Sequence, residues 1–260
     1  MNLDLNNKVF IVTGGAKGIG AAISKTLAAE GAIVMIAGRG KADNARVVDE
    51  IVKSKGRASD QTVELVNADA CKELVQFTME KYGRIDGLIN NAGVNDSIDL
   101  EHGSPEKFVQ SLQKNLLHYY NLAHFALPYL KKSKGVIINI GSKVAETGQG
   151  HTSGYAAAKG GVNALTREWA AELLPYSIRV NAVIPAEVWT PLYENWINSL
   201  PDPKTKLEQI VSKIPFEKRF TTSEEIADMV VFLASGRSSH TTGQIIYVDG
   251  GYTHLDRSLS

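Results

Sequence analysis

Thr13-Gly14-Gly15-Ala16-Lys17-Gly18-Ile19-Gly20 is a glycine-rich stretch near the N-terminus. An apolar, β-branched run, Val9 to Val12, leads into it, and an amphipathic stretch, Ile19 to Glu30, follows it. Glycines allow a tight turn and let backbone N–H groups approach a pyrophosphate, whose charge is favoured at a helix N-terminus. A strand, a glycine-rich turn and a helix in this order therefore predict a dinucleotide-binding site. The expected contacts come from Gly14, Lys17, Gly18, Ile19 and Gly20.

The same alternation of strand-like and helix-like segments continues along the chain. Because each parallel crossover usually needs a helix, this α/β pattern predicts a Rossmann-type, doubly wound sheet of seven mostly parallel strands with helices on both faces. A single domain over residues 1–260 is expected. The expected strands are Val9–Val12, Ile33–Ala37, Val63–Val66, Gly87–Ile89, Val136–Ile140, Arg179–Ile184 and Ile245–Val248. The expected helices are Ile19–Glu30, Ala42–Lys55, Lys72–Tyr82, Glu106–Lys131, Tyr155–Leu174 and Glu224–Ala234.

The segment from 185 to 215 interrupts this alternation. It is rich in proline, contains Trp189 and Trp196, and has only weak periodicity. An insertion after the sixth strand lies at the carboxyl edge of the sheet, where ligands bind in open α/β folds. We therefore expect a substrate lid there, with a plain surface excursion as the alternative.

Composition restricts the partners and the compartment. Lysine plus arginine and aspartate plus glutamate each number 28, so no overall field attracts nucleic acid or an anionic membrane. Cys71 is the single cysteine, which excludes an internal disulfide and fits a reducing compartment. The sequence has no recognisable secretion signal or membrane-spanning apolar run, so we expect a cytoplasmic protein. The histidines lack metal-ligand spacing, so no metal site is expected.

The end of the second expected strand bears on the choice of nucleotide. An acid there would accept hydrogen bonds from both ribose hydroxyls, but the run Ile36-Ala37-Gly38-Arg39 offers none. Arg39, helped by Lys17, could instead bind a 2′-phosphate, so NADP is predicted to be preferred over NAD. The alternative is that Arg39 stacks on adenine and that both cofactors bind.

Further nucleotide contacts are expected after the third and fourth strands. Asp69 could accept a hydrogen bond from the adenine amino group, with Ala70 beside it, while Asn91 and Gly93 suit a close approach to ribose.

A tyrosine and a lysine, Tyr155 and Lys159, stand four residues apart in a stretch with strong helical preference. Their side chains therefore project from one helix face. A free phenol has a pKa of about 10, so Tyr155 can accept a proton near neutrality only if a neighbour such as the Lys159 ammonium stabilises its phenolate. Ser142 ends the fifth expected strand and can hydrogen-bond a substrate oxygen. Asn115 places an amide in the middle of a long helix, where it needs partners.

Together these motifs resemble the short-chain dehydrogenase/reductase family over almost the whole chain. They are Thr13-Gly-x-x-x-Gly-x-Gly20, Asn90-Asn-Ala-Gly93, Asn115, Ser142 and Tyr155-x-x-x-Lys159. The resemblance implies that Tyr155 is the general acid/base and that Ser142 orients the reacting oxygen. It implies that Lys159 lowers the pKa of the tyrosine and binds the nicotinamide ribose, and that Asn115 holds a water in a proton relay.

The resemblance carries three further expectations. Val188 and Thr190 match positions that contact the nicotinamide carboxamide, and basic residues at the positions of Arg39 and Lys17 accompany NADP preference. In this family the counterparts of the two longest helices pair across a subunit interface, so a homotetramer is expected. A thick core within one chain would give the same apolar pattern.

The strand-end loops predict a polar substrate pocket. Many family members have Pro-Gly where this chain has Pro185-Ala186, followed by Glu187 and Trp189. A carboxylate and an indole beside the reacting centre suit a sugar, whose hydroxyls donate to the acid and whose C–H face packs on an aromatic ring. The predicted substrate contacts are Asn95, Ser142, Lys143, Gln149, His151, Glu187 and Trp189.

Segments on this expected substrate side, such as Thr147 to Tyr155 and Ile184 to Tyr193, resemble bacterial L-fucose dehydrogenases within the family. That resemblance implies NAD(P)-dependent oxidation of the anomeric hydroxyl of L-fucose, or of a related sugar, to the lactone. A 3-oxoacyl or other carbonyl reductase of the same family is the alternative. A regulatory protein that only binds the dinucleotide is a third candidate, although it would not need to keep all four residues of the chemical site.

Overall fold

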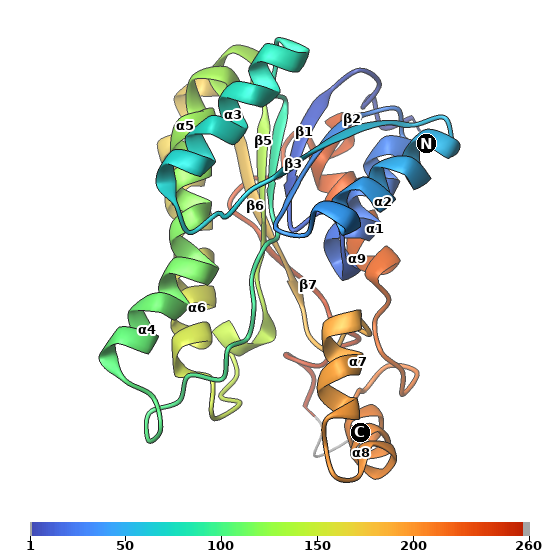
Figure 1. Ribbon diagram of the computed structural model, residues 1–260, viewed down its shortest axis with the longest axis vertical. Coiled ribbons are helices and arrows are strands. Elements are labelled where there is room, and N and C mark those ends of the chain that lie inside the picture. The colour runs from blue at the N-terminus through green and yellow to red at the C-terminus, as the bar shows by residue number, and fades with distance from the viewer. Residues whose placement is uncertain (1, 257–260) are drawn as a thin grey trace.

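The computed structural model describes residues 2–256 and contains one seven-stranded sheet in the order β3-β2-β1-β4-β5-β6-β7 (Figure 1). The strands are β1 (Val9–Thr13), β2 (Ile33–Gly38), β3 (Arg57–Thr62), β4 (Gly87–Asn90), β5 (Val136–Ile140), β6 (Arg179–Pro185) and β7 (Ile245–Val248). Every neighbouring pair is parallel. The chain winds outward from β1 to β3, returns to β4 and then winds the other way. This confirms the predicted doubly wound α/β fold.

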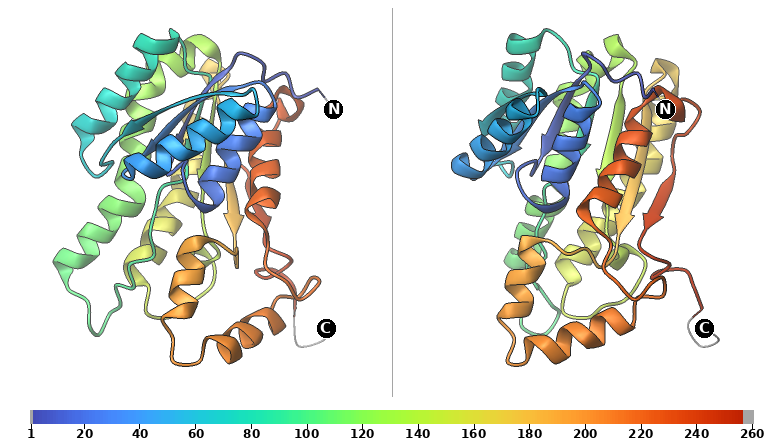
Figure 2. Two further views of the ribbon diagram at one scale, coloured as in Figure 1. Left: turned by 45° about the vertical axis from the view of Figure 1, so that its right-hand side comes forward. Right: turned by 90° about the vertical axis from the view of Figure 1, so that its right-hand side faces the viewer.

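Helices cover both faces of the sheet. Their bounds are α1 (Gly18–Ala29), α2 (Lys41–Lys53), α3 (Ala68–Tyr82), α4 (Pro105–Leu112), α5 (His118–Ser133), α6 (Ser153–Glu172), α7 (Pro191–Asn198), α8 (Pro203–Ser212) and α9 (Ser223–Ala234). Side chains of α1, α2 and α9 share one apolar cluster with the sheet, and side chains of α3, α5 and α6 share the other. Figure 2 shows these two layers from other directions.

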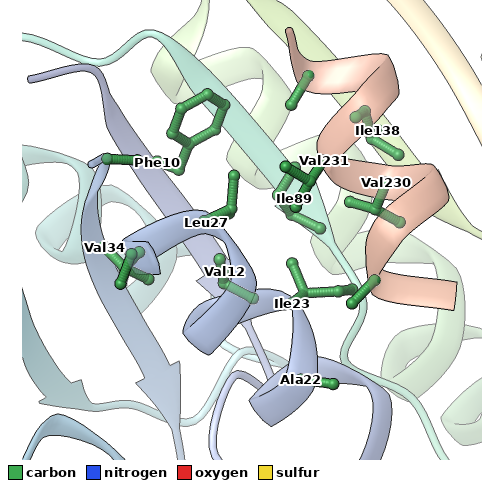
Figure 3. Packing of buried hydrophobic residues seen from close by; sticks show 14 of the residues in the cluster. Phe10, Val12, Ala22, Ile23, Leu27, Val34, Ile89, Ile138, Val230 and Val231 are labelled. Atoms are coloured by element: carbon green, nitrogen blue, oxygen red, sulfur yellow. The ribbon is translucent and has the colours of Figure 1, made fainter. Parts of the chain in front are cut away.

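The core follows from the alternation of side chains along the strands. Phe10 and Val12 point to the face covered by α1 and α9, whereas Ile11 points to the opposite face. Figure 3 shows Leu27 of α1 and Val230 of α9 packed over this part of the sheet. Because both faces are covered, the central strands read as continuous apolar runs, which is why the sequence located them.

The third strand is the exception, and the prediction of Val63–Val66 was wrong. The structure places β3 at Arg57–Thr62, whose side chains are mostly polar. This strand pairs only with β2, at the edge of the sheet, and Ser59 is its one buried residue. An edge strand tolerates polar side chains because one side of it faces solvent. The apolar residues of 63–66 follow the strand.

The helix predicted over 106–131 is divided in the structure. A π-helical turn, Gln113–Leu117, separates α4 from α5. Asn115 lies in this turn, and its Nδ2 donates to the carbonyl of Ser111, four residues earlier, at 3.0 Å. The side chain thus competes for the acceptor that an α-helix would use for its own backbone, which favours the wider turn.

The segment from 185 to 215 contains two helices that the periodicity did not reveal. Thr190 caps α7 by accepting from the N–H of Tyr193, and Asp202 caps α8 by accepting from the N–H of Thr205. Both helices are short and begin with proline. They lie beyond the carboxyl ends of the strands (Figures 1 and 2). Within residues 2–256, no helix has the length and hydropathy needed to cross a bilayer.

Candidate active site

A cleft of about 900 Å³ lies at the carboxyl ends of the central strands. The strand order reverses there, between β1 and β4, and this is the position at which open α/β sheets bind ligands. Most of the predicted cofactor contacts meet in this cleft. Those that line it are Gly14, Lys17, Gly18, Ile19, Gly20, Arg39, Asn91, Gly93, Tyr155, Lys159 and Thr190.

The glycine turn is shaped to receive an anionic group. Gly14 and Gly18 have φ values of +61° and +48°, in the left-handed region that favours glycine. A Cβ on Gly20 would lie only 2.1 Å from the carbonyl oxygen of Gly14. Lys17, the N-cap of α1, makes no side-chain cap hydrogen bond, so the first N–H groups of the helix lack a side-chain acceptor. These features fit a pyrophosphate at the start of α1.

The two basic side chains expected at a 2′-phosphate each lie near an acid. The Lys17 ammonium is 2.8 Å from Asp43, and the Arg39 guanidinium is 3.9 Å from Glu64. Both cations are well exposed, so these ion pairs are weak and their partners can be exchanged. Lys17 and Arg39 both line the nucleotide end of the cleft, and a phosphate bound there could replace their present partners.

Asp69 and Ala70, which were predicted to contact adenine, do not line the cleft that the described residues form. Their N–H groups bond to the side chain of Asn67, the N-cap of α3, and both residues belong to the first turn of that helix. Glu64 and Leu65 line the cleft instead. This difference in the lining follows from the misplaced third strand, because the strand ends at Thr62 and the loop after it reaches the cleft earlier than expected.

The loop after β4 is bonded to the glycine turn. The Thr13 hydroxyl accepts from the N–H groups of Asn91 and Ala92 at 2.9 and 3.0 Å, and Asn91 Nδ2 donates to the Thr13 carbonyl at 2.8 Å. Farther along this loop, a Cβ on Gly93 would lie 3.0 Å from Asn115 Oδ1. The loop thus connects the nucleotide end of the cleft to its chemical end.

Lys159 is almost completely buried at the chemical end. Its Nζ donates to the Ile140 carbonyl at 2.8 Å and to the Tyr119 hydroxyl at 3.0 Å. Burial disfavours the charged ammonium and lowers the pKa of Lys159 to about 7.

Tyr155 lies one helical turn before Lys159, with Nζ 5.6 Å from its ring centroid. The pKa of Tyr155 is raised to about 12, mainly by burial; a hydrogen bond with Ser142 lowers it, and the Asp96 carboxylate adds to the rise. The pKa of Tyr155 is therefore not lowered in this arrangement, contrary to expectation. The reason is that burial dominates, while the hydrogen bonds of Lys159 go to other groups.

Asn115 and Ser142 are fixed by backbone contacts. Asn115 is fully buried, and its Oδ1 accepts from the N–H of Val94 at 2.7 Å, which holds the loop after β4 against the π-helical turn. Ser142 follows β5 and caps a short 3₁₀ turn, Lys143–Ala145. Neither side chain is part of the cleft lining. Asn115 lies against the loop that carries Gly93, and Ser142 hydrogen-bonds with Tyr155, and both Gly93 and Tyr155 do line the cleft.

Comparisons with known proteins agree with this geometry. A sequence model described as enoyl-(acyl carrier protein) reductase matches residues 14–253. The 3-oxoacyl-(acyl-carrier-protein) reductase FabG of Thermotoga maritima is 37% identical over 248 residues, which cover 95% of this chain and 98% of that protein. The L-fucose dehydrogenase of Bos taurus is 38% identical over 245 residues, which cover 94% of this chain and 88% of that protein. The chain belongs to the short-chain dehydrogenase/reductase family.

A solved structure described as Cj0485 dehydrogenase resembles this family member along its whole length. The TM-score is 0.94 at 46% sequence identity, covering 100% of this chain and 99% of that one.

Lys143 and Glu187, two predicted substrate contacts of this short-chain dehydrogenase/reductase, pair with each other and do not line the cleft. Their side chains form a close ion pair that is largely buried, and Lys143 Nζ also lies 3.9 Å from the ring centroid of Tyr252. A buried charge needs a partner, and here the protein supplies it. The predicted role of Glu187 as an acceptor for a sugar hydroxyl did not include this pairing.

Trp189 and Val188 also do not line the cleft that the described residues form. The ring of Trp189 packs against Phe220 at 5.3 Å and Tyr193 at 6.1 Å between centroids. Val188 is buried and forms a parallel bridge with Thr221, so only Thr190 of the predicted carboxamide contacts lines the cleft.

Three further predicted substrate contacts stand outside the cleft lining. His151 is exposed, and its Nδ1 lies 3.1 Å from Asp99. Asn95 Oδ1 accepts from the N–H of Ser97 at 3.2 Å, and Gln149 is exposed. These residues belong to the loops after β4 and β5, but their side chains bond to nearby loop residues or face solvent.

The cleft contains polar residues that the sequence patterns did not identify. Asp96, Lys114 and His118 line it near Tyr155. Burial lowers the pKa of His118 to about 4, and its Nε2 bonds to the Lys114 carbonyl at 2.9 Å, so the ring is neutral. The sequence offered one signal for them, because Asp96 closely follows the Asn90–Gly93 motif, and Lys114 and His118 flank Asn115. Among residues 2–256, no three His, Cys, Asp or Glu side chains are grouped to hold a metal ion.

Proposed function

We propose that this protein is an NAD(P)-dependent dehydrogenase that oxidises the anomeric hydroxyl of L-fucose, or of a stereochemically related sugar, to the lactone. The observation that carries the proposal is the continuity of one cleft from the glycine turn at Gly14–Gly20 to Tyr155 and Lys159. A nicotinamide cofactor bound along this cleft would supply the hydride acceptor.

The chemical roles belong to four side chains. Tyr155 removes the proton from the C1 hydroxyl, and Ser142, which hydrogen-bonds with it, orients the reacting oxygen. Lys159 binds the nicotinamide ribose from its fixed position beside Ile140. Asn115 holds the wall of the cleft and, in this proposal, positions a relay water.

Two relatives support different substrates to a similar degree. The likeness to L-fucose dehydrogenase supports a sugar, whereas the likeness to FabG supports reduction of a 3-oxoacyl thioester as the second candidate. Asp96 and Lys114 favour the sugar, because a charged pair in the cleft suits hydroxyl groups better than an acyl chain.

The proposal extends to cofactor, assembly and compartment. NADP is preferred, supported by Arg39 and Lys17 at the nucleotide end of the cleft, and NAD is the alternative. The protein is a cytoplasmic homotetramer that acts on a small molecule.

The test is a substrate panel with purified protein, followed by absorbance near 340 nm. Oxidation is assayed with L-fucose, D-arabinose, L-galactose and common hexoses, with NADP and NAD in parallel, and reduction is assayed with 3-oxoacyl thioesters. The proposal predicts nucleotide reduction with L-fucose and its stereochemical relatives, and a higher kcat/KM with NADP. Turnover of thioesters with no reaction of any sugar would transfer the assignment to the second candidate.

A further inference from the structure

Asp96 carries a carboxylate oxygen that the protein leaves without a hydrogen-bond partner. Its Oδ1 accepts from the Ser111 hydroxyl at 2.8 Å, but the buried Oδ2 accepts from none of the described residues. The nearest cation is Lys114, whose Nζ lies 3.9 Å from Oδ2, beyond hydrogen-bond distance. A buried charged oxygen with an unfilled acceptor site is unfavourable, so a native protein is expected to use it.

The loop that carries Asp96 is fixed beside Tyr155. The N–H of Gly154, the residue before the tyrosine, donates to the Ile98 carbonyl at 3.2 Å. A Cβ on Gly154 would lie 2.8 Å from the Ser111 hydroxyl oxygen, so the start of α6 packs directly on the residue that binds Asp96. Asp96 also faces the same cleft as Tyr155.

We propose that Asp96 is a substrate-binding residue whose carboxylate accepts a hydrogen bond from a hydroxyl of a sugar or similar polyol, close to the carbon that Tyr155 acts on. Lys114, which lines the cleft with a half-exposed side chain, donates to a neighbouring hydroxyl. The inference rests on the proposed function. Because the terminal torsion of aspartate is broad, a small rotation of the carboxylate turns Oδ2 toward the ligand.

Other acids near the cleft are already engaged. Glu187 pairs with Lys143, and Asp99 accepts from the N–H and the ring of His102. At the nucleotide end, Asp43 pairs with Lys17. Asp96 is therefore the described carboxylate at the chemical end whose acceptor capacity a substrate can complete. An ionised carboxylate only accepts, so it selects a ligand with hydroxyl donors and gains nothing from a thioester chain.

The experiment combines Asp96→Asn with a series of sugars that each lack one hydroxyl. Asparagine keeps an oxygen for Ser111 but replaces the charged acceptor by an amide. Glu101→Gln, an exposed carboxylate on the same loop, is the matched control. The kinetic constants kcat and KM are measured for the sugar that the wild-type protein oxidises with the highest kcat/KM, and for the deoxy analogues of that sugar. The Kd of the nucleotide is measured separately by fluorescence titration.

We expect Asp96→Asn to lower kcat/KM for the intact sugar by about 10- to 100-fold, mainly through KM, with nucleotide Kd within about twofold. With the wild-type protein, kcat/KM should be lower by a similar factor for one deoxy analogue than for the intact sugar. With Asp96→Asn, kcat/KM for that analogue should be little lower than for the intact sugar, which identifies the hydroxyl that Asp96 binds. Glu101→Gln should behave as wild type. Asp96→Ser, a smaller polar replacement, serves as a second variant if the asparagine form does not fold.

The outcomes separate the two proposals. A wild-type protein that oxidises sugars, with an Asp96→Asn variant of unchanged kcat/KM, overturns the role of Asp96 alone. If Asp96→Asn lowers kcat/KM equally for the intact sugar and for every deoxy analogue, the role of Asp96 is also overturned, because Asp96 would then bind no particular hydroxyl. A wild-type protein that oxidises no sugar overturns the proposed function and this inference with it.

Discussion

At the residue scale, the chemical site holds two ionisable side chains in an environment that favours their neutral forms. Burial lowers the pKa of Lys159 to about 7 and raises that of Tyr155 to about 12. Lys159 is nonetheless positioned tightly, because the Ile140 carbonyl and the Tyr119 hydroxyl both bind its Nζ. The base needed for oxidation is thus scarce at neutral pH and becomes abundant only as pH rises.

This arrangement predicts a pH dependence for sugar oxidation. The reactive form of Tyr155 is the phenolate, and below a pKa its fraction grows tenfold for each unit of pH. We therefore expect kcat/KM to rise into the alkaline range when it is measured from neutral pH upward at constant ionic strength. Tyr155→Phe should lose about 10²- to 10⁴-fold in turnover while it keeps its nucleotide affinity. A flat profile, or a phenylalanine variant with most of its rate, would remove Tyr155 from the proposed role.

Roles that depend on local spacing could be predicted from the sequence better than roles that depend on contacts between distant segments. Tyr155 and Lys159 are four residues apart on one helix, so the sequence alone placed their side chains on the same face. Asp96 could not be singled out, because its importance depends on Ser111 taking one oxygen and on no group taking the other. The ion pair of Glu187 was not predicted for the converse reason, since its partner Lys143 is distant in sequence.

At the element scale, the ends of helices were predictable where a cap is local. The sequence Thr222-Ser-Glu-Glu225 indicates a capping box, and the structure confirms it at the start of α9. Ser104 likewise caps α4 before a proline. The π-helical turn and β3 were not predictable in this way. The first depends on the side chain of Asn115 bonding to the backbone, and the second on its place at the edge of the sheet.

The capping box on α9 should contribute measurably to stability. Thr222→Ala removes the acceptor for the N–H of Glu225, so we expect a loss of about 1 kcal/mol and a lower thermal midpoint at fixed protein concentration. Arg219 and this cap depress the pKa of Glu225 to about 2. That carboxylate contribution is present above the unfolded-state pKa and is lost as pH falls toward 2. Because Arg219 and the Thr222 backbone N–H remain in the variant, wild type and variant should both lose it in acid. Ser223→Ala, inside the helix, is the control. An unchanged midpoint for Thr222→Ala at neutral pH would contradict this account.

At the scale of the whole molecule, the alternation of apolar runs and amphipathic stretches was enough to predict the sheet and its two helical layers. The α7–α8 region beyond the sheet was expected as an insertion, although its helices were not. Large apolar side chains also stay exposed on the outer side of the π-helical turn and α5: Leu117 is 46% exposed and Tyr120 is 53% exposed. Such side chains are suited to a subunit interface.

We expect these residues to lie in the interface of the proposed homotetramer. Light scattering coupled to size exclusion should give four times the chain mass of 28.2 kDa. Tyr120→Glu should yield smaller species, whereas Val52→Glu, equally exposed at 53% on α2, should not. A wild-type mass equal to that of one chain would refute the proposal, and an intact tetramer with Tyr120→Glu would place the interface elsewhere.

In the proposed reaction, hydride leaves the anomeric carbon of a sugar bound beside Tyr155. The most direct measurement is turnover of L-fucose carrying deuterium only at C1, with mass analysis of the reduced nicotinamide. We expect the deuterium to appear in the reduced cofactor and the sugar product to be the lactone. Reduced cofactor without deuterium would mean that oxidation takes place at another carbon and would contradict the proposed reaction.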